Sequence, residues 1–154
     1  MGEATGAAAI FGVTGGVMEA ALRSVSEILT GEELEKIEFK EIRGEQGIKR
    51  ASLKLGERDI KVVVAHGLGN AQTIMEEIKS GKADYQFVEI MACPGGCIMG
   101  GGQPIKNSKI RGTIDVRRKR AEAMYSIDEK SKIRKSHENP ILKQIYSEYI
   151  GVPG

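Results

Sequence analysis

Residues 89–104 have the sequence EIMACPGGCIMGGGQP, and the remaining residues have to be arranged around this segment. It begins as an apolar strand and continues into a loop that holds five glycines and both cysteines of the chain, Cys93 and Cys97. Glycines lack side chains and let backbone amides approach a bulky group, and two thiols four residues apart can both face that group. Ordinary packing requires neither feature. The segment therefore predicts a metal or cluster site at the carboxyl end of a strand.

The residues alone leave several kinds of site open. An iron–sulfur cluster accounts for both the thiols and the glycines. Zinc is the main alternative, because the spacing of Cys93 and Cys97 is within the range of zinc ligands and His66 and His137 could complete a Cys2His2 set. A redox-active disulfide is less typical with three residues between the cysteines than with two. Two buried thiols in an ordinary turn would leave the glycines unexplained.

Apolar runs alternate with glycine-containing turns through the preceding residues. Glycine turns at Thr14-Gly15-Gly16 and Gly56-Glu57 separate the first of these runs. Periodicity and turn residues predict, in order, a buried strand over 7–13, a helix over 17–29, two hairpin strands over 48–55 and 59–65, a helix capped by Asn70 that runs through Lys79, and a strand over 85–91. The fold class we expect is α/β: one lobe of a twisted sheet flanked by helices, followed by a mostly helical C-terminal tail.

Charge divides the chain into two parts. Residues 1–104 carry 11 basic and 15 acidic side chains (net −4), whereas residues 105–154 carry 12 and 6 (net +6). We expect the lobe to cover 1–104 and the basic tail 105–154. The densest basic stretch, 117–120, is interpreted as a solvated helix face, because acidic residues are interleaved with it. Nucleic acid is not an expected partner, since Tyr125 is the one aromatic residue close to that stretch.

Composition excludes several classes of protein. A chain of 154 residues has room for one domain, and 40% hydrophobic with 29% charged residues is typical of a globular protein. No apolar run approaches the ~18 residues of a membrane span, so a membrane protein is not expected. The first residues show no signal segment, and two cysteines cannot form a disulfide framework. These features predict the reducing cytoplasm as the compartment.

Residues 89–104 resemble the most C-terminal cysteine motif of the iron-only, or [FeFe], hydrogenases. Two further stretches agree with that family: residues 6–23, which contain GGVMEAALR at 15–23, and residues 120–154, which contain RKSHENP at 134–140. The second of these is similar to the tail that forms a separate small subunit in some members. The resemblance spans nearly the whole chain and implies the C-terminal part of the catalytic H-cluster domain, with the tail fused to it.

The resemblance also implies a cofactor and roles for five residues. In the family, a [4Fe–4S] cubane is bridged through a cysteine sulfur to a di-iron centre that carries CO, cyanide and a dithiolate, and the reaction interconverts protons, electrons and dihydrogen. Cys93 resembles a ligand of the cubane alone, and Cys97 resembles the bridging cysteine. Met91 matches a pocket methionine beside the di-iron centre, so the implied catalytic residues are Cys97 and Met91. Phe11 and Val17 match apolar residues that keep the centre dry.

The chain supplies two of the four cysteines that a cubane needs. In the family the other two come from upstream motifs, which also carry the groups that deliver protons. We therefore expect a piece of the catalytic domain, or a subunit that joins a partner bearing the rest and is inactive alone. Whether the chain alone binds any cluster is left open. In the complete enzyme, the resemblance implies a ferredoxin-like electron donor.

Two alternatives to a hydrogenase remain open. One is a non-catalytic iron–sulfur carrier or sensor of the same superfamily, and the other is a structural zinc module. The carboxylates nearest the motifs are Glu19 and Glu89, and proton transfer by either is conceivable. We favour a helix-surface charge for Glu19 and an anchor to loop amides for Glu89.

Overall fold

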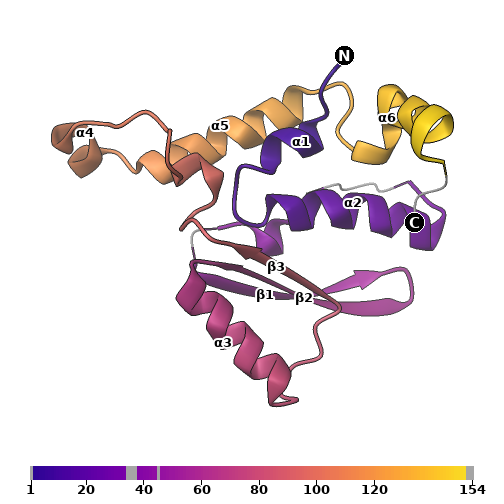
Figure 1. Ribbon diagram of the computed structural model, residues 1–154, viewed down its shortest axis with the longest axis horizontal. Helices are drawn as coiled ribbons and strands as arrows, with labels where there is room; N and C mark the ends of the chain where they lie inside the picture. Colours follow the sequence, from indigo (N-terminus) through magenta and orange to yellow (C-terminus); the bar gives the residue numbers. More distant parts are fainter. Residues whose placement is uncertain (1, 34–37, 45, 152–154) are drawn as a thin grey trace.

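A three-stranded sheet lies at the centre of the described residues, 2–33, 38–44 and 46–151, of this computed structural model (Figure 1). β1 (Ile48–Leu55) and β2 (Arg58–His66) form the expected antiparallel hairpin. β3 (Phe87–Met91) lies parallel to β2 on its other side, after the crossover helix α3 (Leu68–Lys79). The predicted α/β class and three of the four predicted strands are confirmed. Asn70 was wrongly expected to cap α3, which begins two residues earlier.

Helices cover both faces of the sheet. α2 (Gly16–Thr30) lies over one face and α3 lies over the other (Figure 1). Side chains of β2 point alternately to the two faces, as the two-residue period of a strand requires. The buried residues accordingly form two clusters, Met18, Leu22, Ile42, Leu53, Leu55, Val62 and Val64 on the α2 side and Val63, Ala65 and Ile74 on the α3 side.

The first helix replaces a strand that the sequence led us to expect. α1 spans Gly6–Ile10, so the prediction of a strand over residues 7–13 was wrong. Three of these five residues are alanine, the strongest helix former, and the Thr5 hydroxyl caps the helix by accepting the N–H of Ala8 at 3.2 Å. Periodicity does not separate helix from strand in so short an apolar run. α1 packs against α5 and not in the sheet.

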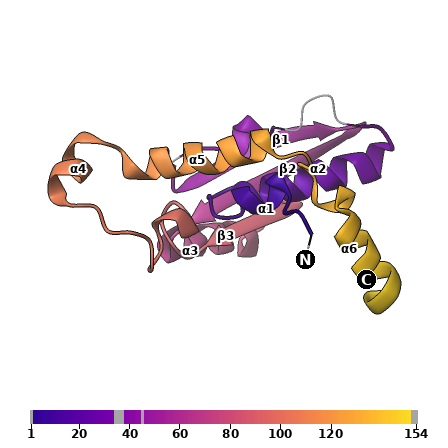
Figure 2. The ribbon, with the colours of Figure 1, turned by 90° about the horizontal axis from the view of Figure 1, so that it is seen from above.

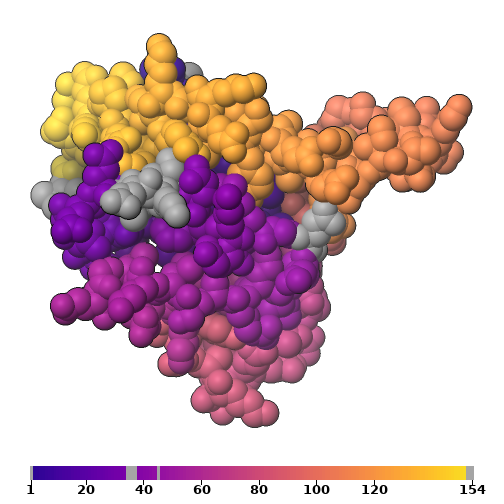
Figure 3. Space-filling model, turned by 180° about the vertical axis from the view of Figure 1, so that it is seen from behind, coloured from indigo at the N-terminus to yellow at the C-terminus, as the bar shows by residue number. Residues whose placement is uncertain are grey.

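The tail is mostly helical, as expected. α4 (Ser108–Thr113) lies at the tip of an arm that stands away from the rest of the molecule (Figure 2 and Figure 3). α5 (Val116–Lys130) returns along the body. α6 (Pro140–Ile145) begins after Asn139, whose side chain caps the helix by accepting the N–H of Ile141 at 2.9 Å. Short helical turns complete the described chain: η1 (Lys40–Ile42), η2 (Cys97–Met99), η3 (Ser136–Glu138) and η4 (Tyr146–Ile150).

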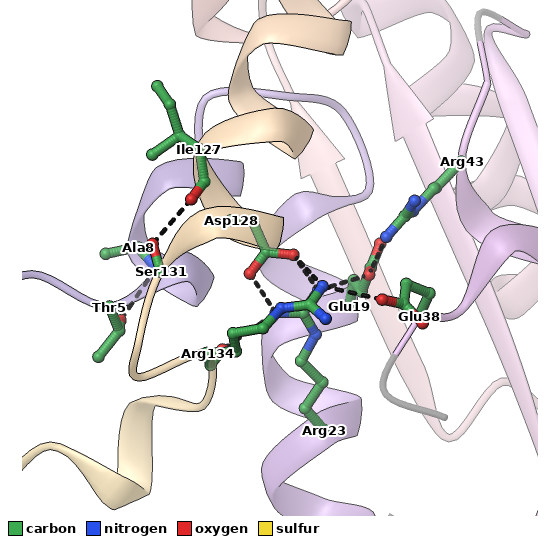
Figure 4. A network of polar contacts seen from close by, with 10 residues as sticks. All are labelled: Thr5, Ala8, Glu19, Arg23, Glu38, Arg43, Ile127, Asp128, Ser131 and Arg134. Carbon is green, nitrogen blue, oxygen red and sulfur yellow. Dashed lines mark hydrogen bonds and ion pairs between the residues drawn. The ribbon is translucent and has the colours of Figure 1, made fainter. Parts of the chain in front are cut away.

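A buried network of charged side chains joins α2 to α5 (Figure 4). Arg23 donates from Nη1 and Nη2 to the two carboxylate oxygens of Asp128, each at 2.8 Å, and Nη2 also reaches Glu19 at 2.8 Å. All three side chains have no exposed surface. Glu19 was therefore wrongly expected to be a helix-surface charge. Outside this centre, Arg43 donates to Glu19 and Arg134 donates to Asp128.

Hydrogen bonds keep the buried carboxylate of Asp128 charged. Burial alone would raise the pKa of Asp128, but hydrogen bonds from Arg23 and Arg134 outweigh burial and hold that pKa below its ordinary value. A charge inside a protein costs several kcal/mol unless a partner with good geometry compensates it. Removing either helix would leave a buried charge on the other without its partner, so α2 and α5 depend on each other in this position.

None of the helices within the described ranges combines the length and the hydropathy that a membrane span requires.

Replacing Asp128 tests this network. Asp128→Ala leaves the guanidinium of Arg23 buried without its two-pronged partner, and we expect the free energy of unfolding to fall by about 3–5 kcal/mol. Urea denaturation measures this loss. The neighbouring Glu129 is exposed, so Glu129→Ala serves as the control and should leave stability unchanged. Equal stability of the two variants would contradict the role given to the network.

Candidate metal centre

The cysteine loop begins where β3 ends. Met91 is the last residue of β3, Cys93 follows two residues later, and Cys97 is the first residue of η2. Cys93 is half-buried, Cys97 is exposed, and both thiols are free. Backbone hydrogen bonds from Gly96 to the Cys93 carbonyl (3.0 Å) and from Gly100 to the Cys97 carbonyl (3.1 Å) hold each cysteine at the start of a tight turn.

Glycines let this loop lie directly on the turn between α1 and α2. Gly96 has φ +95°, and a Cβ there would come within 2.7 Å of the Gly12 carbonyl oxygen and of the Thr14 nitrogen. The two segments are hydrogen-bonded to each other, from Ile98 N–H to the Gly12 carbonyl at 3.0 Å and from Thr14 N–H to the Gly95 carbonyl at 3.3 Å. A side chain at Gly96 would separate them, so the packing of the loop requires a glycine there.

Space for a bulky group remains beside the sulfurs. A Cβ on Gly100 would lie 3.4 Å from Cys93 Sγ, so the bare glycine leaves one side of this sulfur open. Cys97 opens onto a hollow of about 210 Å³ whose walls include Gly12, Gln103 and Arg120. Two free thiols at a glycine-lined loop are a suitable half of a soft-metal or iron–sulfur site.

Glu89 fixes the glycine turn against the cysteine strand. Its carboxylate accepts the N–H of Gly15 at 2.7 Å and the N–H of Met18 at 2.6 Å. These groups lie at the N-terminus of α2, where Gly15 provides no side-chain cap and a negative charge is favourable. Glu89 comes from β3, two residues before Met91. The expectation that Glu89 anchors loop amides is confirmed.

Lys49 supports the same turn from the neighbouring strand. It is buried, with 4% of its surface exposed, and its ammonium donates to the Thr14 carbonyl at 2.9 Å and to the Gly44 carbonyl at 3.3 Å. Burial lowers the pKa of Lys49 to about 8, against the opposing attraction of Glu89. No role was predicted for Lys49 from the sequence. Its position in β1, as the basic residue in an otherwise apolar series of alternate residues, is the signal that could have identified it.

The remaining expected site residues lie around the loop. Phe11 follows α1 and is 45% exposed, Val17 is the second residue of α2 and is half-buried, and Met91 is half-buried at the end of β3. The bonds of Glu89 and the contacts of Gly12 with the loop place the segments that carry these residues side by side. Roles for Phe11, Val17 and Met91 at a cofactor remain predictions.

The histidines do not join the cysteines. His137 lies between the Ser24 hydroxyl, 2.8 Å from Nδ1, and the Glu27 carboxylate, 2.8 Å from Nε2. Within the described ranges, the group of three metal-ligand side chains close enough to share an ion is Glu27, His137 and Glu138, and neither cysteine belongs to it. The described residues therefore do not assemble the Cys2His2 zinc set that the sequence left open.

Two arginines of α5 contact the cysteine loop, which the sequence analysis missed. The expectation of a solvated face holds for Arg118 and Lys119, which are exposed and pair with Glu122. Arg120 instead donates to the carbonyls of Ile98 (2.8 Å) and Pro104 (2.6 Å), and the side chain of Arg117 lies 3.0 Å from where a Cβ on Gly95 would be. The detectable signal was spacing: positions 117, 120, 121, 124, 125 and 128 form one stripe of a helix.

Comparison with known proteins places the chain in a family. The family model for the C-terminal domain of the iron-only hydrogenase large subunit matches residues 1–101. The chain belongs to the iron-only hydrogenases. A second model, for the iron hydrogenase small subunit, matches residues 114–154. The resemblance found in the sequence is thereby confirmed for both the cysteine motif and the tail.

Individual iron-only hydrogenases are similar along much of the chain. The NADP-reducing hydrogenase subunit HndD of Solidesulfovibrio fructosivorans is 46% identical over 153 residues, 99% of this chain and 25% of the relative. The periplasmic [Fe] hydrogenase large subunit of Nitratidesulfovibrio vulgaris is 53% identical over 105 residues, 68% of this chain and 25% of the relative. The chain thus spans about a quarter of the length of these relatives.

Structure comparison agrees with the sequence matches. A variant of the [FeFe]-hydrogenase HydA1 from Chlamydomonas reinhardtii has a TM-score of 0.68 and 38% sequence identity, covering 94% of this chain and 42% of that chain. A more distant relative is Protein NAR1 of Arabidopsis thaliana, 34% identical over 94% of this chain and 30% of the relative.

The packing of the hydrogenase cysteine loop predicts different outcomes at two of its glycines. Gly96→Ala places a Cβ against backbone atoms at a positive φ, a strain of about 1–3 kcal/mol before any clash is added. We expect lower stability in urea denaturation and faster amide exchange across residues 93–100. Gly101→Ala is the matched control, because a Cβ there meets nothing within 4 Å. Equal effects of the two substitutions would contradict the described packing.

The buried lysine beside the loop predicts a dependence of stability on pH. The pKa of Lys49 is about 8 in the folded protein, below the ordinary value of 10.5, so the unfolded chain binds more protons between these values. The free energy of unfolding should therefore rise as pH increases from about 8 to 10. Urea denaturation across that range measures the slope. Lys49→Met removes the titrating group and should flatten the slope; an unchanged slope would exclude Lys49 as its source.

Proposed function

We propose that this chain is the C-terminal part of an [FeFe] hydrogenase catalytic domain and takes part in the reversible reduction of protons to dihydrogen. The observation that carries the proposal is the cysteine loop: two free thiols, placed at the carboxyl end of β3 and packed through glycines onto the N-terminal turn of α2. Ligand sites of open sheets favour that end of the strands. Membership of the iron-only hydrogenase family supports an iron–sulfur site, and proton reduction, as the chemistry of these two thiols.

The donor set of this loop fits part of an H-cluster. Cys93 would bind the cubane alone, and Cys97 would bind the cubane and join it to the di-iron centre. When bound, the cluster would pass electrons from an external donor to the iron site at which protons and dihydrogen are interconverted. Water would be excluded from the cluster by the apolar side chains of Met91, Phe11 and Val17. Phe11 is 45% exposed in this chain, as expected for an apolar side chain that a further polypeptide segment covers.

A second polypeptide segment must complete the site. Cubanes take four protein ligands, and the sequence contains two cysteines. The proposal therefore includes a partner, the N-terminal part of the catalytic domain or a subunit bearing it, which supplies the other thiols. Exposed apolar side chains near the loop, Ile90 (41%) and Met99 (38%), provide surface for that contact.

The proposal extends to organisation, electron supply and compartment. Residues 1–104 would form the lobe that carries the cluster and residues 105–154 the small-subunit-like tail. A ferredoxin-like protein would exchange electrons with the complete enzyme. Free cysteines without a disulfide framework suit the cytoplasm, which is the compartment we propose.

A non-catalytic cluster carrier is the second candidate function. Its support is the similarity to a probable cytosolic Fe-S cluster assembly factor of Aedes aegypti, which is 31% identical over 142 residues, 92% of this chain and 28% of the relative. The higher identity to hydrogenases over the same length, and the match of residues 114–154 to the hydrogenase small subunit, favour the catalytic assignment.

Complementation tests the proposed function. The chain is to be co-expressed anaerobically, in a host that assembles H-clusters, with the upstream part of a relative's catalytic domain that carries the other cysteines. We expect dye-driven hydrogen evolution only when both parts are present, and its loss in Cys93→Ser and in Cys97→Ser. Glu129→Ala should retain activity, because Glu129 is an exposed residue of α5 outside the cysteine loop.

Iron counting on the same samples separates the two candidate functions. A full complement of iron in the two-part complex without hydrogen evolution would contradict the hydrogenase proposal. A stoichiometric cubane on the chain alone that can be passed to an apo-protein would support a carrier instead.

A further inference from the structure

Arg120 holds both ends of the glycine run that follows Cys97. Its Nη1 donates to the Ile98 carbonyl at 2.8 Å and its Nη2 donates to the Pro104 carbonyl at 2.6 Å. Nη1 also lies 3.7 Å from the sulfur of Met99. Ile98 is the residue after Cys97, and Pro104 ends the loop. One planar guanidinium therefore spans the segment of three consecutive glycines, 100–102.

Among the described residues, few other hydrogen bonds hold this segment. Three consecutive glycines provide no side chains for packing, and Gly102 has φ +87°. The backbone hydrogen bond within the run, from Gln103 N–H to the Gly100 carbonyl, is long at 3.4 Å. Charge-assisted hydrogen bonds are shorter and roughly twice as strong as neutral ones, and the rigid fork of an arginine satisfies two acceptors at once. Arg120 is thus the main tie across the glycine run.

The position of the glycine run affects both thiols. Gly100 donates its N–H to the Cys97 carbonyl at 3.1 Å, and a Cβ on Gly100 would lie 3.4 Å from Cys93 Sγ. Movement of the run would therefore change the space beside one sulfur and the backbone of the other cysteine. Arg120 and Cys97 also line the same hollow of about 210 Å³. A fixed cationic side chain therefore forms part of the wall of the space beside the exposed thiol, with its charge held on the carbonyls of Ile98 and Pro104.

The contact crosses from one part of the chain to the other. Ile98 lies within residues 1–101, matched by the large-subunit model, and Arg120 lies within residues 114–154, matched by the small-subunit model. The buried pair of Arg23 and Asp128 fixes the helix that carries Arg120. The tail therefore has a route to influence the cysteine loop without contributing a ligand.

We propose that Arg120, in the small-subunit-like tail, is a positioning residue for the cysteine loop: it holds the Cys97 segment in its ligating arrangement and favours the reduced state of a cluster bound there. The second half of this inference rests on the proposed function, because it needs a cluster. An iron–sulfur cluster with thiolate ligands is anionic, and a nearby cation stabilises the additional electron of the reduced form.

Three variants of the full chain test the positioning role without any cluster. Arg120→Gln removes the charge and the fork, whereas Arg120→Lys keeps the charge but cannot hold both carbonyls. Arg118→Gln is the control, because Arg118 lies on the same helix with 64% of its side chain exposed and pairs only with Glu122 among the described ion pairs. Amide hydrogen exchange over residues 97–103 is the readout.

In Arg120→Gln we expect exchange of the loop amides to be faster by on the order of tenfold, the factor that a charge-assisted hydrogen bond contributes. Arg120→Lys should be intermediate and Arg118→Gln unchanged, while the exchange of β2 amides stays the same in all three. Loop exchange in Arg120→Gln that equals that of the unaltered chain would overturn the positioning role, whether or not a cluster assembles.

The same variants in the reconstituted two-part complex test the effect on the cluster. A redox titration followed by EPR should give a lower midpoint potential for Arg120→Gln than for the unaltered complex, with recovery in Arg120→Lys and no shift in Arg118→Gln. Equal potentials in Arg120→Gln and the unaltered complex would overturn the electrostatic role. Failure of the unaltered complex to bind iron would contradict the proposed function, and the exchange experiment would still decide the positioning role.

Discussion

Two opposite charges that water does not reach hold this structure together. The guanidinium of Arg23 and the carboxylate of Asp128 are both fully buried, and each would be strongly unfavourable without the other. Helix α2 can therefore cover the sheet while carrying a buried charged side chain only because α5 lies beside it. Through this interaction, a side chain of the tail is buried against the lobe. The two parts carry net charges of opposite sign, −4 over residues 1–104 and +6 over residues 105–154.

The cysteine loop is placed by a closed series of contacts that starts from the same helix. The N-terminus of α2 binds the Glu89 carboxylate, and Glu89 belongs to the strand that leads to Cys93. The loop then packs on the turn before α2, and Arg120 connects it to α5. Because α5 is joined back to α2 by the buried ion pair, a shift in one member of the series strains the others.

Local patterns were sufficient for some of these features and not for others. The hairpin could be predicted because β-branched runs and a glycine turn encode it within 20 residues, and the cysteine loop because its motif is contiguous. The short alanine run before Phe11 misled because strand and helix share that pattern. Glu19 was misjudged because it is buried beside Arg23, and the burial of Arg23 depends on Asp128. Asp128 lies 105 residues from Arg23 in sequence, so no local pattern indicates the contact. Arg120 escaped notice because its acceptors are backbone carbonyls, which no side-chain pattern reveals.

The arm that carries α4 acts as a covalent tether between the lobe and the tail. Its Ile105 is 93% exposed, and the arm stands away from the body instead of packing on it (Figure 3). A tether of this kind keeps two binding surfaces at an effective concentration in roughly the millimolar range. The contacts of α5 with the lobe are consequently intramolecular, and their occupancy does not depend on how dilute the protein is. Cleavage within the arm would leave every one of these contacts chemically intact and yet make the assembly of the cysteine loop a bimolecular, concentration-dependent equilibrium.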